Sequence, residues 1–158
     1  MDWKKNDVFQ VQIEDMSDTG EGIGKTDGFT WFVKDAVIGD VVEARVMKTK
    51  KSYGFARLMQ VLEPSACRVT PRCPSARQCG GCQLQAMSYE EQLRFKENKV
   101  RNNLSRIGGL TEIPMEPIIG MDEPWRYRNK AQFPFGKDKD GRIITGFYAG
   151  RTHAIIEQ

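Results

Sequence analysis

The sequence has no long apolar run, and it has no cysteine outside one short segment. A membrane-spanning helix needs about eighteen or more consecutive apolar residues, and no stretch of the 158 residues approaches that length. No apolar signal-peptide core follows the N-terminal residues 1–6. We therefore expect a soluble cytoplasmic protein with no membrane partner. In that reducing compartment cysteines favour metal binding over disulfides.

The four cysteines lie within sixteen residues, in the spacing C-x5-C-x5-C-x2-C, at positions 67, 73, 79 and 82. Structural zinc sites usually combine two close pairs, and only Cys79/Cys82 has that spacing. Three clustered thiolates with a more distant fourth ligand are typical of a 4Fe–4S cluster. Gly80-Gly81 would let backbone N–H groups approach its sulfides. The pattern favours a cluster and leaves open a zinc site of four cysteines or a redox sensor.

Positive charge is concentrated in the middle of the chain. Residues 1–43 carry four lysines and ten acidic residues, a net charge of −6, whereas residues 44–109 carry thirteen basic and four acidic residues, a net charge of +9. Such a segment fits a polyanionic partner, with RNA or DNA as the natural candidate. Three arginines, at positions 68, 72 and 77, lie among the cysteines, where they could favour thiolates or contact phosphates.

Short β-strands separated by turns are predicted for residues 7–62. The expected strands are 8–13, 29–33, 40–47 and 53–62, which together suggest a small barrel. Asp27-Gly28 predicts a tight turn. The glycine-rich stretch 20–25 lacks the spacing of a phosphate-binding loop, so we expect a barrel turn or bulge there.

The hairpin tip at residues 48–53 has the composition of an RNA contact. Its lysines, Lys48, Lys50 and Lys51, can neutralise phosphates. Tyr53 could stack on a base or pack on the barrel. We expect Phe55 in the core.

Ser88 and Glu91 predict the start of a helix, and Gly108-Gly109 its end. Its apolar stripe is expected to be core, and it consists of Tyr89, Leu93, Val100, Leu104 and Ile107. A proline-punctuated connector, 110–124, follows. Strands are then expected at 125–134, 142–148 and 152–158, with a hairpin turn at 138–142.

Residues 2–62 resemble the TRAM domain, a small RNA-binding barrel. The resemblance rests on Gly20-x-Gly22-Ile23-Gly24, on Phe32-Val33 followed by Ile38-Gly39-Asp40-Val41-Val42, and on Arg45-Val46 with Lys50 and Tyr53-Gly54-Phe55-Ala56. Next, Cys73-Pro74-x4-Cys79-Gly80-Gly81-Cys82-Gln83-x-Gln85 resembles the cluster motif of RNA uracil-5-methyltransferases of the 23S ribosomal RNA type. A helix and a Tyr-Arg-Asn-Lys-like motif follow in the order of that family.

The resemblance implies a mainly β chain with one long helix. Its parts would be an OB-like TRAM barrel (1–62), a cluster-binding segment (63–87), the helix (88–109) and part of an α+β central RNA-contacting domain (110–158). The cluster ligands would be Cys73, Cys79 and Cys82, with the family's fourth ligand falling past Gln158 and Cys67 only a substitute. RNA contacts are expected from Lys48, Lys50, Lys51, Tyr53, Arg126, Arg128, Asn129 and Lys130.

The resemblance also implies transfer of a methyl group from S-adenosylmethionine to C5 of a uridine in 23S rRNA. That family places its catalytic cysteine and cofactor site in a C-terminal Rossmann-like domain, and the sequence has no strand–glycine-loop–helix pattern of that kind. We therefore expect an N-terminal portion that is monomeric, binds RNA and a 4Fe–4S cluster, and contains no catalytic residue. The alternative is a stand-alone RNA-binding protein with a structural zinc site made by all four cysteines.

Overall fold

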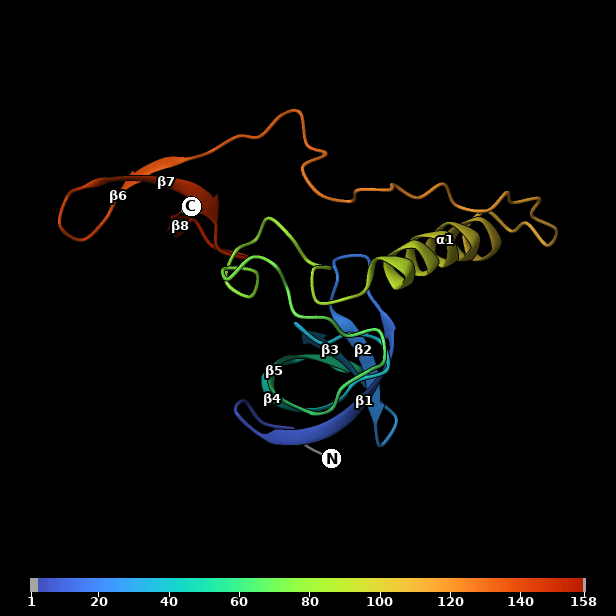
Figure 1. Ribbon diagram of the computed structural model, residues 1–158. Coiled ribbons are helices and arrows are strands. Elements are labelled where there is room, and N and C mark those ends of the chain that lie inside the picture. The colour runs from blue at the N-terminus through green and yellow to red at the C-terminus, as the bar shows by residue number, and fades with distance from the viewer. Residues whose placement is uncertain (1–2, 158) are drawn as a thin grey trace.

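The computed structural model describes residues 3–157, which form a barrel, a loop segment, a helix and a small sheet (Figure 1). The barrel strands are β1 (Val8–Met16), β2 (Gly22–Thr26), β3 (Phe29–Lys34), β4 (Val41–Thr49) and β5 (Tyr53–Glu63). The helix α1 (Tyr89–Arg106) precedes the sheet strands β6 (Phe135–Lys137), β7 (Ile143–Tyr148) and β8 (Ile155–Glu157). A mainly β chain with a five-stranded barrel and one long helix is thus confirmed for the described residues. The outer ends of the predicted segments, residues 1, 2 and 158, lie outside them.

The barrel is closed, with the strand order β1-β2-β3-β5-β4 and β4 pairing back to β1. Only β3 and β5 run parallel among its pairs. Alternation along β1 puts Phe9, Val11 and Ile13 into the core, as expected for a strand with one buried face. Trp31 fills the centre, and a Cβ at Gly54 would lie 2.3 Å from its ring, so only glycine fits there.

The predicted turn at Asp27-Gly28 is confirmed, because both residues have positive φ, 51° and 78°, in the two-residue link between β2 and β3. The prediction for residues 20–25 was wrong in part. Gly20 lies in a turn with φ 84°, but β2 begins at Gly22. A Cβ at Gly24 would lie 2.3 Å from the carbonyl oxygen of Gln12, so this glycine permits the close approach of β1 and β2.

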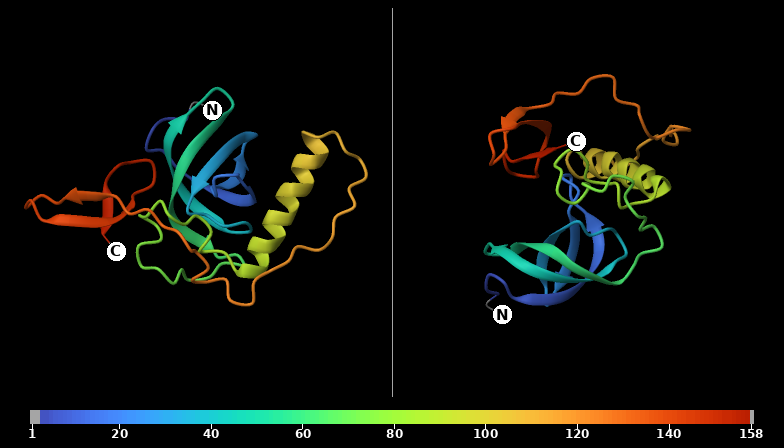
Figure 2. Two further views of the ribbon diagram at one scale, coloured as in Figure 1. Left: turned by 90° about the horizontal axis from the view of Figure 1, so that it is seen from above. Right: turned by 60° about the vertical axis from the view of Figure 1, so that its left-hand side comes forward.

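The apolar stripe of α1 is not core, contrary to the prediction. No residue of the helix is buried, and Val100 and Ile107 are 50% and 84% exposed. The connector leaves the far end of α1 and turns back toward the first turns of the helix (Figure 2). There the backbone N–H of Met121 donates to the Tyr89 hydroxyl at 2.8 Å.

The helix instead docks through a more polar face. Ser88 caps it as predicted, accepting from the backbone N–H of Glu91. The Gln92 side-chain amide donates to the carbonyls of Leu84 and Met87 at 3.1 and 3.0 Å. Phe95 packs on a small buried cluster around Met87. One turn further, Lys99 pairs with Asp18 of the barrel at 3.0 Å.

The segment 125–134 is not a strand, so this prediction was also wrong. Arg126 has a positive φ of 57°, and the chain stays irregular until β6 begins after Pro134. The predicted hairpin turn at 138–142 is confirmed between β6 and β7. Among residues 3–157, no helix is long and apolar enough to cross a membrane.

Candidate functional site

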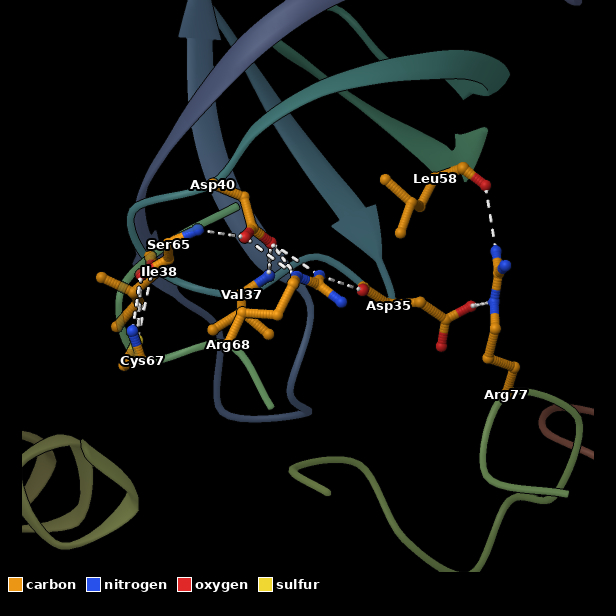
Figure 3. Close-up of polar contacts among 9 residues, drawn as sticks. All are labelled: Asp35, Val37, Ile38, Asp40, Leu58, Ser65, Cys67, Arg68 and Arg77. Carbon is orange, nitrogen blue, oxygen red and sulfur yellow. Dashed lines mark hydrogen bonds and ion pairs between the residues drawn. The ribbon is translucent and has the colours of Figure 1, made fainter. Parts of the chain in front are cut away.

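A buried ion pair fixes the point where the cysteine segment leaves the barrel (Figure 3). Asp40 is 0% exposed, and its carboxylate lies 2.6 Å from Nη2 of Arg68. It also accepts the backbone N–H groups of Val37 and Ser65 at 2.8 and 3.0 Å. Arg68 is therefore engaged by a carboxylate of the barrel, which corrects the expectation that it serves thiolates or phosphates.

The other two arginines of the segment also have protein partners. Nε of Arg77 lies 3.7 Å from the Asp35 carboxylate, and its Nη2 donates to the Leu58 carbonyl at 3.2 Å (Figure 3). The guanidinium of Arg72 lies over the Trp125 ring, 4.8 Å from its centroid. Together these side chains tie the cysteine segment to its neighbours in the fold.

Cys67 lies at the junction between the barrel and the cysteine segment. Its Sγ lies 3.1 Å from the Ser65 hydroxyl and donates to the Ile38 carbonyl at 3.4 Å. It packs beside the buried cluster of Met16, Val37 and Met87. These contacts belong to the barrel junction and favour a packing role for this thiol.

Residues 73–85 form a closed loop that contacts the end of β7. The backbone N–H of Cys73 donates to the side-chain oxygen of Gln85 at 3.3 Å, which ties the two ends together. At the tip, the N–H of Gly80 donates to the carbonyl of Tyr148 at 2.8 Å. A Cβ at position 80 would lie 2.9 Å from that oxygen, so the contact requires glycine.

The donor chemistry of this loop fits a thiolate-held group. All the cysteines are free, and the backbone N–H of Gly81 already donates to Sγ of Cys79 at 3.3 Å. An open cavity of about 790 Å³ adjoins the loop and is lined by Cys79 and Cys82. Within residues 3–157, however, no three potential ligands are gathered at metal-binding distances. The ligand set Cys73, Cys79 and Cys82 stays a prediction.

Arg151, which follows β7, reaches the barrel and pairs with Glu21. Burial raises the pKa of Glu21, but hydrogen bonds from Ser17 and Thr19 and the Arg151 charge together lower it below its ordinary value. Glu21 therefore holds its charge in a largely buried position. The pair joins the turn before β2 to the turn beside the cysteine loop.

Replacement of Glu21 by glutamine should cost about 1–2 kcal/mol of stability at neutral pH, since it removes hydrogen bonds to a charged group. Because the folded-state pKa is lowered, this contribution is present above the ordinary pKa of glutamate and is lost as the pH falls through the folded-state pKa. Urea unfolding of wild type and Glu21→Gln at decreasing pH should show the gap closing. Glu112→Gln, at an exposed position, serves as control. A gap that does not change with pH would contradict the role of the carboxylate.

The predicted RNA-binding residues fall into two exposed groups. Lys48, Lys50, Lys51 and Tyr53 lie together at the tip between β4 and β5. The second group lies in the extended segment on the other side of the cysteine segment from the barrel (Figure 1), and it comprises Arg126, Arg128, Asn129 and Lys130. The structure does not bring the two groups together.

Phe55 is not in the core, contrary to the prediction. It lies on the outer side of β5, with ring centroids 5.5 Å from Phe32 and 5.7 Å from Tyr53. From the sequence we did not single out Phe32 as an outward-facing aromatic residue. Its position between the buried Trp31 and Val33 would have indicated an outward side chain, because side chains alternate along a strand.

Comparison with known proteins places the barrel in a family. Residues 2–59 match the model of the TRAM domain. The chain is 50% identical over 97% of its length to an uncharacterised RNA methyltransferase of Halalkalibacterium halodurans, and 48% identical over 98% to one of Clostridium tetani. It spans 33% of the length of each. A solved structure, the Pyrococcus abyssi tRNA (uracil-54, C5)-methyltransferase with S-adenosyl-L-homocysteine, is 29% identical over 63% of this chain and 21% of its own, with a TM-score of 0.39.

The five-stranded barrel thus coincides with residues 2–59, the part of the chain that matches the TRAM domain. Over nearly its whole length the chain is similar to proteins named RNA methyltransferases. It spans one third of the length of those relatives.

Proposed function

We propose that this chain is the RNA-recognition and 4Fe–4S-binding part of an RNA methyltransferase that methylates C5 of a uridine in 23S rRNA. The observation that carries the RNA-binding role is the TRAM barrel with its exposed basic tip at Lys48, Lys50 and Lys51. Homologues named RNA methyltransferases support the reaction class. The uracil-5 and 23S assignments rest on the resemblance of the cysteine motif.

RNA binding by the tip follows from its charge and position. The three lysines lie on a hairpin end that is exposed along its whole length, so their ammonium groups can reach a phosphate backbone without reorganising the barrel. Arg126 and Arg128 supply a second basic site across the cysteine segment, which would let one RNA contact both parts of the chain.

A 4Fe–4S cluster would be held by Cys73, Cys79 and Cys82. When bound, it would supply a covalent cross-link within residues 73–82 and a structural tie for that loop. The chain's own part is visible in the Gly81 N–H that donates to Sγ of Cys79 and in the Gly80 contact with Tyr148. This loop would then shape the surface between the barrel and the β6–β7–β8 sheet.

The RNA-binding role can be tested by the salt dependence of binding. A Lys48→Gln/Lys50→Gln/Lys51→Gln variant should bind single-stranded RNA more weakly and show a slope of log affinity against log salt that is smaller by about 2, because each phosphate contact contributes about 0.7. Lys137→Gln/Lys139→Gln removes exposed charge from the β6–β7 hairpin and should change neither value. If the triple variant binds RNA as tightly as wild type, the tip at Lys48, Lys50 and Lys51 is not an RNA-binding surface. The variant Arg126→Gln/Arg128→Gln tests the second basic site in the same way.

We assign no residue of this chain to methyl transfer or to binding of S-adenosylmethionine. The 158 residues alone are therefore expected to bind RNA without methylating it. Incubation with labelled S-adenosylmethionine and 23S rRNA measures this, and transfer of label to uridine would contradict the assignment.

A further inference from the structure

Three aromatic side chains form a patch on the outside of the barrel. Phe32 of β3 and Phe55 of β5 are opposite each other in register, and Tyr53 precedes Phe55 by one outward position. The three ring centroids lie 5.5–5.7 Å apart. Tyr53 is 36% exposed and the two phenylalanine residues are half-buried. We call these residues the aromatic patch. They face away from the core around Trp31, so the interior packing of the barrel does not account for them.

Cationic side chains surround the aromatic patch. Lys48 of β4 is paired in register with Phe55. At the next outward position beyond the phenylalanine pair, Lys34 is opposite Arg57. Neither β3 nor the first six residues of β5 contain an acidic residue. A protein partner would need apolar or acidic complementarity, whereas aromatic rings interleaved with cations match the faces of bases and the charge of phosphates.

The patch is bounded on one side by a residue from a distant part of the chain. The guanidinium of Arg151 lies over the Phe55 ring, 5.6 Å from its centroid. Its pairing with Glu21 fixes it there, and Glu21 in turn accepts from the Ser17 hydroxyl at 2.5 Å. The planar guanidinium lies over the Phe55 ring, and its N–H groups that do not face Glu21 can donate to a phosphate. The patch is thus composite, with rings from the barrel and a cation from the turn beside the cysteine loop.

We propose that the aromatic patch stacks an unpaired base of single-stranded RNA, while the surrounding cations hold the adjacent phosphates. The inference rests on the proposed RNA-binding function and assigns it a specific site. Rings that are already ordered by one another lose little freedom when a base stacks on them, and stacking tolerates any base because each has a π face. The site should therefore add affinity with little sequence preference.

The test uses a single-stranded RNA oligonucleotide containing 2-aminopurine, whose fluorescence is quenched by stacking. Tyr53→Leu and Phe32→Leu should each weaken binding about tenfold and reduce the quenching, since stacking contributes about 1–3 kcal/mol per base. The salt slope should stay the same, because neither change removes a charge. Tyr53→Phe keeps the ring and should bind as wild type does. Phe135→Leu, at a 76% exposed position in β6, is the matched control.

The outcomes separate the two proposals. If wild type binds the RNA and both leucine variants, shown by circular dichroism to be folded, bind and quench equally well, the aromatic patch is not a stacking site and RNA binding stands. Should a leucine variant unfold, the same comparison is made with Phe55→Leu. If wild type does not bind RNA at all, the proposed function itself fails. If Tyr53→Phe weakens RNA binding as much as Tyr53→Leu does, the stacking role is also overturned, because Tyr53→Phe retains the ring.

Discussion

Replacement of Arg68 by methionine is expected to lower the free energy of unfolding by about 3–5 kcal/mol, the usual cost of removing one partner of a buried ion pair. The Asp40 carboxylate that pairs with it is 0% exposed, so loss of the guanidinium leaves a buried negative charge without its partner. Methionine keeps much of the apolar stem, and the loss therefore reports on the charge. Urea unfolding followed by tryptophan fluorescence measures it, since Trp31 lies in the barrel core.

Arg142 provides the matched control. It pairs with Asp138 at 3.0 Å and with Glu157 at 3.1 Å, but at the surface, where ion pairs contribute little to stability. Arg142→Met should therefore cost far less than Arg68→Met. The double variant Arg68→Met/Asp40→Asn should recover part of the loss, because it removes the uncompensated buried charge. Equal costs for the two single variants would show that the Asp40 pair does not hold the barrel to the cysteine segment.

The barrel could be predicted from the sequence because its signals are local. Alternating residues such as Val11 and Ile13 decide which face of β1 is buried, and Asp27-Gly28 decides a turn by its φ preferences alone. We nevertheless predicted the wrong side of β5 for Phe55 from the sequence. Its hydrophobicity suggested the core, whereas alternation with the buried Gly54 and Ala56 places it outside. Periodicity was the better guide than residue type.

The docking of α1 could not be predicted in the same way. Its most apolar stripe, which includes Val100 and Ile107, lies largely exposed, while the polar side chains of Gln92 and Lys99 contact the rest of the fold beside Phe95. Each of these contacts depends on a partner outside the helix, the carbonyls of Leu84 and Met87 for Gln92 and the carboxylate of Asp18 for Lys99, and helical periodicity contains no information about such partners. The same limit applies to Arg68, whose carboxylate lies 28 residues earlier.

The proposed cluster gives the second large effect. In chain reconstituted anaerobically with iron and sulfide, Cys79→Ser should lose essentially all bound iron, because a serine hydroxyl is a poor ligand for the soft site that thiolates form. A small thiol in the buffer can supply a fourth ligand. Iron and acid-labile sulfide are measured per chain. Cys73→Ser and Cys82→Ser should behave alike, since the cluster needs all three thiolates.

Cys67→Ser is the control that distinguishes a cluster from a four-cysteine zinc site. The Cys67 thiol donates to the Ile38 carbonyl at 3.4 Å, and a serine hydroxyl can make the same hydrogen bond. Iron binding should therefore match wild type, with only a small change in stability from altered packing at the junction. If the wild-type chain binds zinc rather than iron, and both Cys67→Ser and Cys79→Ser lose the zinc, the site is a four-cysteine zinc site and not a cluster. That result would require the loop at residues 73–85 to move toward the barrel junction, because within residues 3–157 the structure gathers no such set of ligands.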